Sequence, residues 1–514
     1  MSKDFNLLDE PWLPVRYAGG DVEHLGLLET FRRSSQIEAI AETEPPSLVA
    51  QYRLLLAILH RALTRAFPDG WKDWDRARWY EDGLPVDAVV DYLGHWRDRF
   101  WLFHPDHPFM QVAVLAEAGE TRDKMKPWTQ IAIANATGNT PVVFDHSLDT
   151  QPVPATPADV VASLLGFLQF TPGGLVKVLR TSDKSGPLMN TAAVLPVGRT
   201  LAQTLTLSLH GPNRDDLPAW ERASLTIAKL SAAASLATGP NDRYTRQSRA
   251  VLLRKDPDGL IRQLHFAVGL ALEEDSNAPD PMACFRAGSS GLVRLGFREA
   301  RSLWRDLPAL APNPAGTSQP PAVLEYAMAL HGERTPFDTP YQPLLVAGVA
   351  SDQAKILRWR SESVVLPLAL LEDPERAQYL RELVEKAEAF FSGCRRLFTA
   401  MLGETLPDPA HRETRSRARQ LFEVGPFPSI YFAMAERALP EVMRLLAEGD
   451  YAGATHHWDG ALRRSALAAW SDAVTGLGKS TRALRAEARA WPRFHDLLAQ
   501  HVPAADTSTT VEEA

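Results

Sequence analysis

The sequence has little cysteine: among its 514 residues, only Cys284 and Cys394 carry a thiol. Two cysteines exclude a disulfide framework and any zinc or iron–sulfur site built from several thiolates. Long apolar runs are missing as well, because no stretch reaches the ~18 uninterrupted apolar residues that span a membrane. The first residues place an acidic side chain before any apolar run, unlike a signal peptide. We therefore expect a soluble, cytoplasmic protein without a membrane partner.

Positive charge is also in deficit, with 55 lysines and arginines against 63 aspartates and glutamates and a formal net charge of -8. This balance excludes a protein that wraps nucleic acid with its entire surface, although local basic patches remain compatible with it. One such patch is expected near the C-terminus, where helical spacing joins Arg482, Arg485, Arg489 and Arg493. This stripe is suited to DNA phosphates, to a partner subunit or to simple exposure to solvent.

The remaining composition is typical of a folded protein, with 45% hydrophobic and 23% charged residues. The length suggests about two to four domains. Up to residue 365, short apolar runs alternate with loops rich in proline and glycine, which predicts a mixed α/β domain. Within it we expect strands at residues 5–8, 12–15 and 200–209, and amphipathic helices at residues 48–65 and 160–170.

Beyond residue 366 the apolar residues recur every three or four positions over long stretches. Short connections separate four such stretches, at residues 380–401, 430–446, 462–474 and 484–498. Four helices that each bury one face satisfy the requirements of an up-and-down bundle. The predicted fold class is therefore α+β, with a large mixed α/β domain at 1–365, a C-terminal four-helix bundle at 366–500 and a disordered tail at 501–514.

Residues 473–480, AVTGLGKS, match a relaxed phosphate-loop consensus through Lys479. A phosphate loop needs a buried strand before it, whereas the residues that precede this segment are helical in period. A glycine turn at the end of a helix is therefore the favoured interpretation, and a nucleotide hydrolase is the rival one.

His104, Asp106 and His107, in the segment HPDHPF, suggest a metal-dependent hydrolase or nuclease. Two prolines hold the segment extended, so the imidazoles do not share one face of a helix as they do in zinc proteases. A structural role of these histidines is favoured. No metal and no cofactor are predicted, and every sign of an enzyme in the sequence is weak.

Several short motifs resemble, in their order, a known family: the large subunit, called CasA, of the type I-E CRISPR surveillance complex Cascade. The specific motifs are FNLLDEPWLPV at residues 5–15 and HPDHPFMQ at residues 104–111. They are followed by TPGG at residues 171–174, RQSR at 246–249 and DQA at 352–354.

The resemblance implies a non-catalytic subunit of an antiviral complex that binds DNA and RNA. It recognises the protospacer-adjacent motif (PAM) in duplex DNA, mainly in the minor groove, initiates strand separation and helps to recruit a helicase-nuclease. The implied partners are the other Cascade subunits, the guide RNA, the double-stranded target and that helicase-nuclease. A helical-bundle scaffold that only docks partner subunits is the alternative.

Gln353 matches the family's glutamine wedge, and Asp352 and Lys355 flank it in a short polar loop. A flat carboxamide can enter the space under a base pair and still hydrogen-bond to base edges while the next pair opens. Lys355 is suited to a phosphate, whereas Asp352 stands where a relative in the family has an amide. A solvated turn is the alternative interpretation of Gln353.

Gly173 and Gly174 match the family's glycine loop, because a backbone without Cβ atoms can approach a groove closely. Gly186 is a competing placement of this loop, and a plain helix C-cap is the structural alternative. The segment 135–146 matches the loop that contacts the guide RNA and the motif. Its candidate contact residues are Asn139, Val142 and Phe144, of which the phenyl ring equally suits core packing.

The family also places a lysine in the minor groove, but the corresponding stretch at residues 264–280 contains no lysine. Arg246 and Arg249 are the nearby cations that could replace it as DNA contacts.

Overall fold

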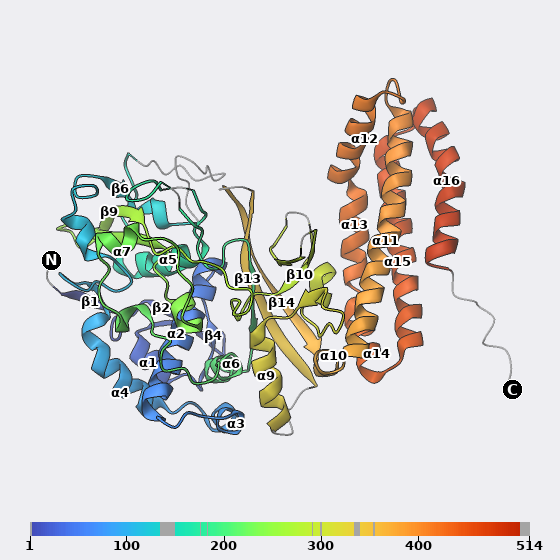
Figure 1. The fold of residues 1–514 in the computed structure, drawn as a ribbon. Helices are drawn as coiled ribbons and strands as arrows, with labels where there is room; N and C mark the ends of the chain where they lie inside the picture. The colour runs from blue at the N-terminus through green and yellow to red at the C-terminus, as the bar shows by residue number, and fades with distance from the viewer. Residues whose placement is uncertain are drawn as a thin grey trace. The chain divides into compact units, whose positions relative to one another are not determined.

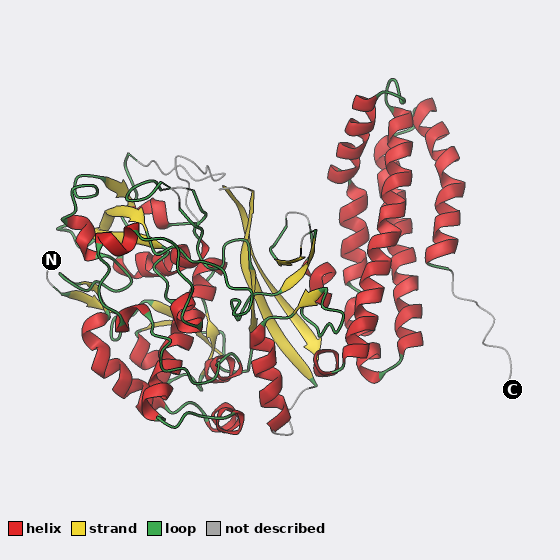
Figure 2. Ribbon diagram, viewed as in Figure 1, coloured by secondary structure: helices red, strands yellow, loops and turns green. Residues whose placement is uncertain are grey.

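The computed structural model describes residues 3–133, 150–174, 176–181, 183–289, 291–298, 301–333, 340–352 and 355–503. The chain forms two compact units: residues 1–299 with 317–365, and residues 300–316 with 366–514. The first unit mixes helices and strands, and the described residues of the second are mainly helical, as the sequence predicts (Figures 1 and 2). The disordered tail predicted at residues 501–514 is wrong at its start, because His501 ends a helix and Val502 is buried. The residues from 504 onward lie outside the described residues.

The strands of the first unit form small sheets of two or three strands each (Figure 2). These sheets are β1 (Asp4–Asn6) with β5 (Trp101–Phe103); β3 (Val22–Leu25), β2 (Leu13–Tyr17) and β4 (Ile37–Ile40); β6 (Met125–Pro127), β9 (Ile261–Val268) and β8 (Arg249–Lys255); β11 (Gly291–Arg294), β10 (Phe285–Gly288) and β12 (Ser318–Gln319); and β14 (Lys355–Pro367), β13 (Tyr341–Asp352) and β7 (Ala192–Pro196). The strands expected at residues 5–8 and 12–15 correspond to β1 and β2, each with shifted ends.

The described residues of the first unit also form several α-helices. They are α1 (Leu27–Arg32), α2 (Pro45–Ala66), α3 (Asp73–Asp82), α4 (Val86–Trp96), α5 (Pro157–Phe170), α6 (Leu201–Leu207), α7 (Ile227–Ser231), α8 (Pro240–Tyr244) and α9 (Ala322–Glu333). Helix α2 is buried along almost its whole length, because its apolar residues surround the helix axis and α4, α5 and β13 pack around it. The helices predicted at residues 48–65 and 160–170 are confirmed by α2 and α5.

The strand predicted at residues 200–209 is wrong, because these residues contain helix α6. The hydroxyl of Thr200 caps the helix by accepting a hydrogen bond from the backbone N–H of Gln203. Nearly every side chain of α6 is buried, including Thr204 and Thr206, and the Thr206 hydroxyl donates to the Ala202 carbonyl. Because the threonines are as buried as the leucines, the alternation of apolar and polar residues did not mark two faces of a strand.

The second unit contains these helices among its described residues: α10 (Leu368–Glu372), α11 (Pro374–Thr405), α12 (Arg412–Val424), α13 (Pro426–Glu436), α14 (Leu439–Glu448), α15 (Tyr451–Leu477) and α16 (Thr481–His501). Aromatic rings fill its core, where Phe391 lies 4.5 Å from Phe432 and Trp470 lies 4.3 Å from Phe494 between ring centroids. None of the described helices is both long and apolar enough to cross a membrane.

The single helix predicted at residues 430–446 is two helices, α13 and α14, because Pro440 stands in the first turn of α14 and favours a new start. Helix α12 was not predicted, since Ala418 and Phe422 are its only buried residues and they provide too short an apolar pattern. The bundle therefore has more helices than the predicted four.

Residues 300–316 belong to the second unit rather than to the first domain in which the sequence analysis placed them. Trp304 packs edge-on against Trp458, with ring centroids 5.6 Å apart. Arg301 and Arg305 both form ion pairs with Glu388 of α11, at 2.8 and 2.7 Å. These contacts fasten the segment to the helices although more than fifty residues of sequence intervene between it and α11.

Candidate nucleic-acid interface

The loop at residues 171–186 contains the glycines that the sequence analysis singled out. It begins at the end of α5, whose first turn is held by a capping box between Thr156 and Asp159. The helix ends at Phe170, and Thr171 directly after it is fully buried. The start of the loop is therefore anchored in the core, whereas its middle reaches the surface at Gly174.

Gly173 and Gly174 differ in their surroundings. Gly174 is exposed, has a φ of 80° and would place a Cβ in open space. A Cβ on Gly173 would lie 3.2 Å from the carbonyl oxygen of Asp183 in the opposite arm of the loop. Gly174 thus supplies a bare, exposed backbone in a left-handed conformation, which is what a close approach to another molecule requires.

Gly186, the competing placement, has a different role. It is buried, and a Cβ there would lie 2.5 Å from the carbonyl oxygen of Gln169. Its backbone N–H donates to the carbonyl of Thr171 at 2.8 Å. Gly186 therefore closes the base of the loop and is not free to meet a ligand.

The structure places Arg249, a predicted DNA contact, inside the protein. Arg249 begins β8, and its side chain is completely buried. Its guanidinium donates to the carbonyls of Pro172 at 2.5 Å and Lys184 at 2.8 Å, and forms an ion pair with Asp183 at 2.8 Å. Burial lowers the pKa of Arg249 to about 10 and raises that of Asp183 to about 6. Arg249 thus holds the glycine loop from inside.

Arg246, the other predicted cation, is also buried, with 3% of its surface exposed. It forms an ion pair with Asp242 at 3.0 Å and donates to the backbone carbonyls of Ser235 at 3.0 Å and Ala271 at 2.9 Å. Its guanidinium therefore links the segments of the core that contain these three partners. A signal in the sequence could have shown this, because Asp242 precedes Arg246 by four residues, the spacing of a helical ion pair.

The end of strand β13 lies beside the segment that follows the glycine loop. Strands β13 and β7 pair antiparallel, with Gly348 opposite Ala192. Two residues before Ala192, Asn190 adopts a φ of 59°, a conformation that asparagine tolerates. The hydroxyl of Ser351, near the end of β13, donates to the side-chain oxygen of Asn190. The fold thereby brings the last residues of β13 to the exit of the glycine loop.

Several predicted contact residues lie outside the described residues, and the structure does not test them. Gln353 and Ala354 connect β13 to β14, and Gln353 follows Ser351 by two positions. Asp352 and Lys355 end β13 and begin β14, but their side chains are also outside the description. The segment with Asn139, Val142 and Phe144 falls in the interval 134–149.

The histidines considered for a metal site have structural partners. His104 is 4% exposed, and its Nδ1 accepts the backbone N–H groups of Asp106 at 3.0 Å and His107 at 2.9 Å. Nδ1 of His107 lies 2.7 Å from the hydroxyl of Ser224. Within the described ranges, no group of three or more histidine, cysteine, aspartate or glutamate side chains could hold a metal ion.

Lys479 lies in the short connection between α15 and α16. Gly478 caps the end of α15 with a φ of 72°, and the hydroxyl of Ser480 caps α16 by accepting from the N–H of Ala483. The element that precedes this turn is a long helix, whereas a phosphate loop requires a strand at that place. The interpretation as a glycine turn at a helix end is confirmed.

The chain is similar to known proteins along most of its length. The family described as CRISPR-associated protein Cse1 matches residues 6–469 of the chain. The CRISPR-associated protein CasA/Cse1 of Thermus thermophilus is 34% identical over 508 residues, which covers 96% of this chain and 97% of that protein.

Solved structures are similar over almost the whole chain. Thermus thermophilus CasA (Cse1) has a TM-score of 0.82 at 32% identity, covering 97% of this chain and 100% of that one. Thermobifida fusca Cse1 has a TM-score of 0.78 at 23% identity and 98% coverage of both chains, which shows a shared fold. The resemblance drawn from the sequence motifs is confirmed: the chain belongs to the Cse1 (CasA) family of CRISPR-associated proteins.

Proposed function

We propose that the chain is the large, non-catalytic subunit of an RNA-guided CRISPR surveillance complex that acts in the cytoplasm with a guide RNA and other subunits. Membership of the Cse1 family supports this role, since the match extends over nearly the whole chain. A chain of a CRISPR RNA-guided surveillance complex also shares the fold, with a TM-score of 0.74 at 22% identity over 96% of this chain and 100% of that one.

Within that complex, the chain reads the protospacer-adjacent motif in duplex DNA, mainly from the minor groove. The observation that carries this proposal is the hydrogen bond from Ser351 to Asn190, which links the end of β13 to the exit of the glycine loop. Gln353 stands two residues beyond Ser351, and Gly174 presents exposed backbone in the loop. An intruding carboxamide needs a neighbouring element that already holds the duplex, because unstacking costs a few kcal/mol per step.

The remaining predicted residues complete this proposed interface. Gly173 supports the close approach of Gly174, and Lys355 meets a phosphate beside the wedge, with Asp352 on its other side. Asn139, Val142 and Phe144 contact the end of the guide RNA and the motif. After strand separation begins, the complex recruits the helicase-nuclease that the resemblance implies.

Strand opening by a reconstituted complex tests this proposal. A target duplex with a fluorescent base analogue beside the motif reports opening, and Gln353→Ala should slow it on the order of tenfold to a hundredfold, since the wedge offsets a few kcal/mol of unstacking. Assembly with the guide RNA should stay intact. Gln36→Ala, an exposed glutamine elsewhere in the first unit, is the matched control and should open DNA normally.

Unchanged opening by Gln353→Ala in an intact complex would leave only the scaffold role. A metal-dependent hydrolase is not supported, because the Nδ1 atom of His104 already accepts two backbone hydrogen bonds.

A further inference from the structure

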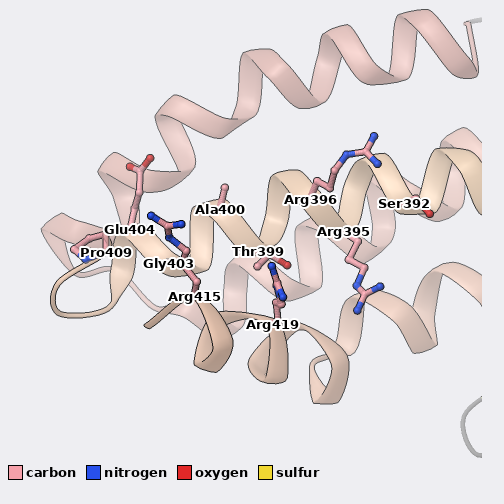
Figure 3. Close-up of a pocket in the computed structure, with 10 residues that line it drawn as sticks. All are labelled: Ser392, Arg395, Arg396, Thr399, Ala400, Gly403, Glu404, Pro409, Arg415 and Arg419. Carbon is pink, nitrogen blue, oxygen red and sulfur yellow. The ribbon is translucent and has the colours of Figure 1, made fainter. Parts of the chain in front are cut away.

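A groove runs between helices α11 and α12 of the second unit, far along the chain from the glycine loop. Its volume is about 690 Å³, and Figure 3 shows the side chains that line it. The residues that line it are Ser392, Arg395, Arg396, Thr399, Ala400, Gly403, Glu404, Pro409, Arg415 and Arg419. Nothing in the proposed reading of the DNA motif uses this groove.

The lining carries strong positive charge on a protein whose formal net charge is -8. The lining contains four arginines and a single carboxylate, that of Glu404, and Glu404 is itself 3.3 Å from Arg489 of α16. Arg395 forms an ion pair with Glu423 at 2.5 Å. Among the described residues, Arg396 and Arg419 form no ion pair, and both side chains are exposed. They are therefore available to an anionic ligand.

The two helices hold these cations in fixed positions. Phe422 of α12 packs on Phe391 and Phe398 of α11, with ring centroids 5.8 and 6.0 Å apart. Arg415 and Arg419 lie one helical turn apart beside this buried seam, which spaces them by roughly 6 Å along the axis. Like charges at this spacing destabilise a helix, and a bound anion would relieve that repulsion.

The chemistry of the lining indicates which anion it suits. A guanidinium presents a planar fork that matches a phosphate with two parallel hydrogen bonds, and the hydroxyls of Ser392 and Thr399 can add further donors. The lining residues include no aromatic side chain, so they offer neither a platform for unstacked bases nor the buried anchor of a protein interface. These features favour a sugar-phosphate backbone held without regard to sequence.

We propose that the α11–α12 groove binds the phosphate backbone of duplex DNA outside the motif. This second contact adds affinity without sequence information, because phosphate contacts position a protein on DNA whereas base contacts specify the sequence. This proposal goes beyond the proposed function, and it depends on that function only in one respect, namely that the chain binds duplex DNA.

The test uses the full chain with Arg396→Glu and Arg419→Glu combined. Binding of a labelled duplex that lacks the motif is followed by fluorescence anisotropy at several salt concentrations. Affinity should fall at least about tenfold, and the slope of log K against log salt should become shallower by about 2, since each lost phosphate contact removes about 0.9. A duplex that contains the motif should lose the same factor, in contrast to the selective effect expected of Gln353→Ala.

The matched control reverses the same number of charges with Arg417→Glu and Arg437→Glu. Both arginines are exposed and neither lines the groove; Arg417 belongs to α12, and Arg437 stands between α13 and α14. This control should keep the wild-type slope. Arg396→Gln with Arg419→Gln, a milder pair, should also weaken binding, and equal unfolding midpoints of all variants show that the fold is retained.

Two results would overturn the proposal. One is equal DNA affinity and equal salt slope in the groove variant and the control. The other is wild-type DNA binding by the groove variant together with failure to join the purified partner subunits, which would assign the groove to a protein.

Discussion

Nη2 of Arg249 lies 2.8 Å from Oδ2 of Asp183, and both side chains are almost completely buried. Asp183 stands in the outgoing arm of the glycine loop, while Arg249 starts a strand of the core. The same guanidinium binds the carbonyl of Pro172 in the incoming arm. One buried cation therefore joins both arms of the loop that we propose to meet DNA, so its removal should affect binding without removing any contact to DNA.

Replacing Arg249 by methionine should lower the free energy of unfolding by about 3–5 kcal/mol, because it leaves a buried carboxylate without its partner. Chemical denaturation measures this loss. Adding Asp183→Asn should recover part of it, with a coupling energy of about 0.5–3 kcal/mol in a double-mutant cycle. Arg254→Met, at an exposed position of the same strand, is the control and should cost less than about 0.5 kcal/mol. Similar losses at positions 249 and 254 would contradict the role of Arg249.

Substitutions at two glycines of the loop should affect the stability of the chain and its affinity for DNA differently. Gly186→Ala forces a Cβ to within 2.5 Å of the Gln169 carbonyl oxygen and should destabilise the chain by about 3 kcal/mol. Gly174→Ala has open space but a positive φ, and should cost only about 1–2 kcal/mol. Thermal unfolding gives the two stabilities. If Gly174 contacts DNA, Gly174→Ala should nonetheless lose more affinity for motif-containing duplex than Gly186→Ala does. Both affinities are measured well below the unfolding temperature.

Buried histidines should make the first unit sensitive to acid. Nε2 of His60 donates to the carbonyl of Gly211 at 3.0 Å, its Nδ1 faces the amide of Asn241 at 2.8 Å, and its ring stacks on His210 at 3.9 Å. Burial lowers the pKa of His60 to about 4, and burial also lowers the pKa of His210 well below its usual value.

In the unfolded chain His60 binds a proton below pH ~6.5, whereas in the folded chain it resists protonation until about pH 4. Stability should therefore be retained above pH ~6.5 and fall as the pH drops toward 4, with His60 contributing on the order of 3 kcal/mol. Comparing urea unfolding of the wild type and His60→Gln across this range isolates the effect. A constant difference between the two proteins at every pH would exclude it.

His104 should contribute to stability through backbone hydrogen bonds and without a metal ion. His104→Ala removes the acceptor of two N–H groups and should lower the free energy of unfolding by about 1–3 kcal/mol. His107→Ala, at a less buried ring, should cost less. Treatment with a chelator should leave the melting temperature of the wild type unchanged, and a clear fall in that temperature would restore the metal hypothesis.

The long helices could be predicted because their signal is local. Helices α2 and α11 carry apolar residues at helical spacing over several turns, and no competing pattern covers the same residues. The short helix α6 could not be predicted in this way, since the core surrounds it and its threonines are buried beside its leucines. Pro440 indicated the break between α13 and α14 in the sequence, but the regular spacing of apolar residues across it favoured a single helix.

The candidate site was less predictable than the fold. Gly174 and Gly186 are equivalent as glycines in a sequence, yet one presents exposed backbone and the other closes a buried turn. Arg246 and Arg249 form part of a polar motif that suits nucleic acid, yet both are buried and form ion pairs with aspartates of the same chain. The cations left exposed in the α11–α12 groove come from two helices, one of which the apolar pattern did not reveal.

By itself, the amino-acid sequence determined the family and the succession of a mixed α/β region and a helical region, because motif order and apolar periodicity are read from neighbours along the chain. Only the tertiary structure decided which charged side chains form ion pairs in the interior and which remain exposed to solvent. Burial and partner choice join residues that are distant in sequence, as Ser351 with Asn190 and Arg249 with Asp183 show. The free energy of a charged side chain depends on its surroundings in the folded protein far more than on its position in a sequence motif.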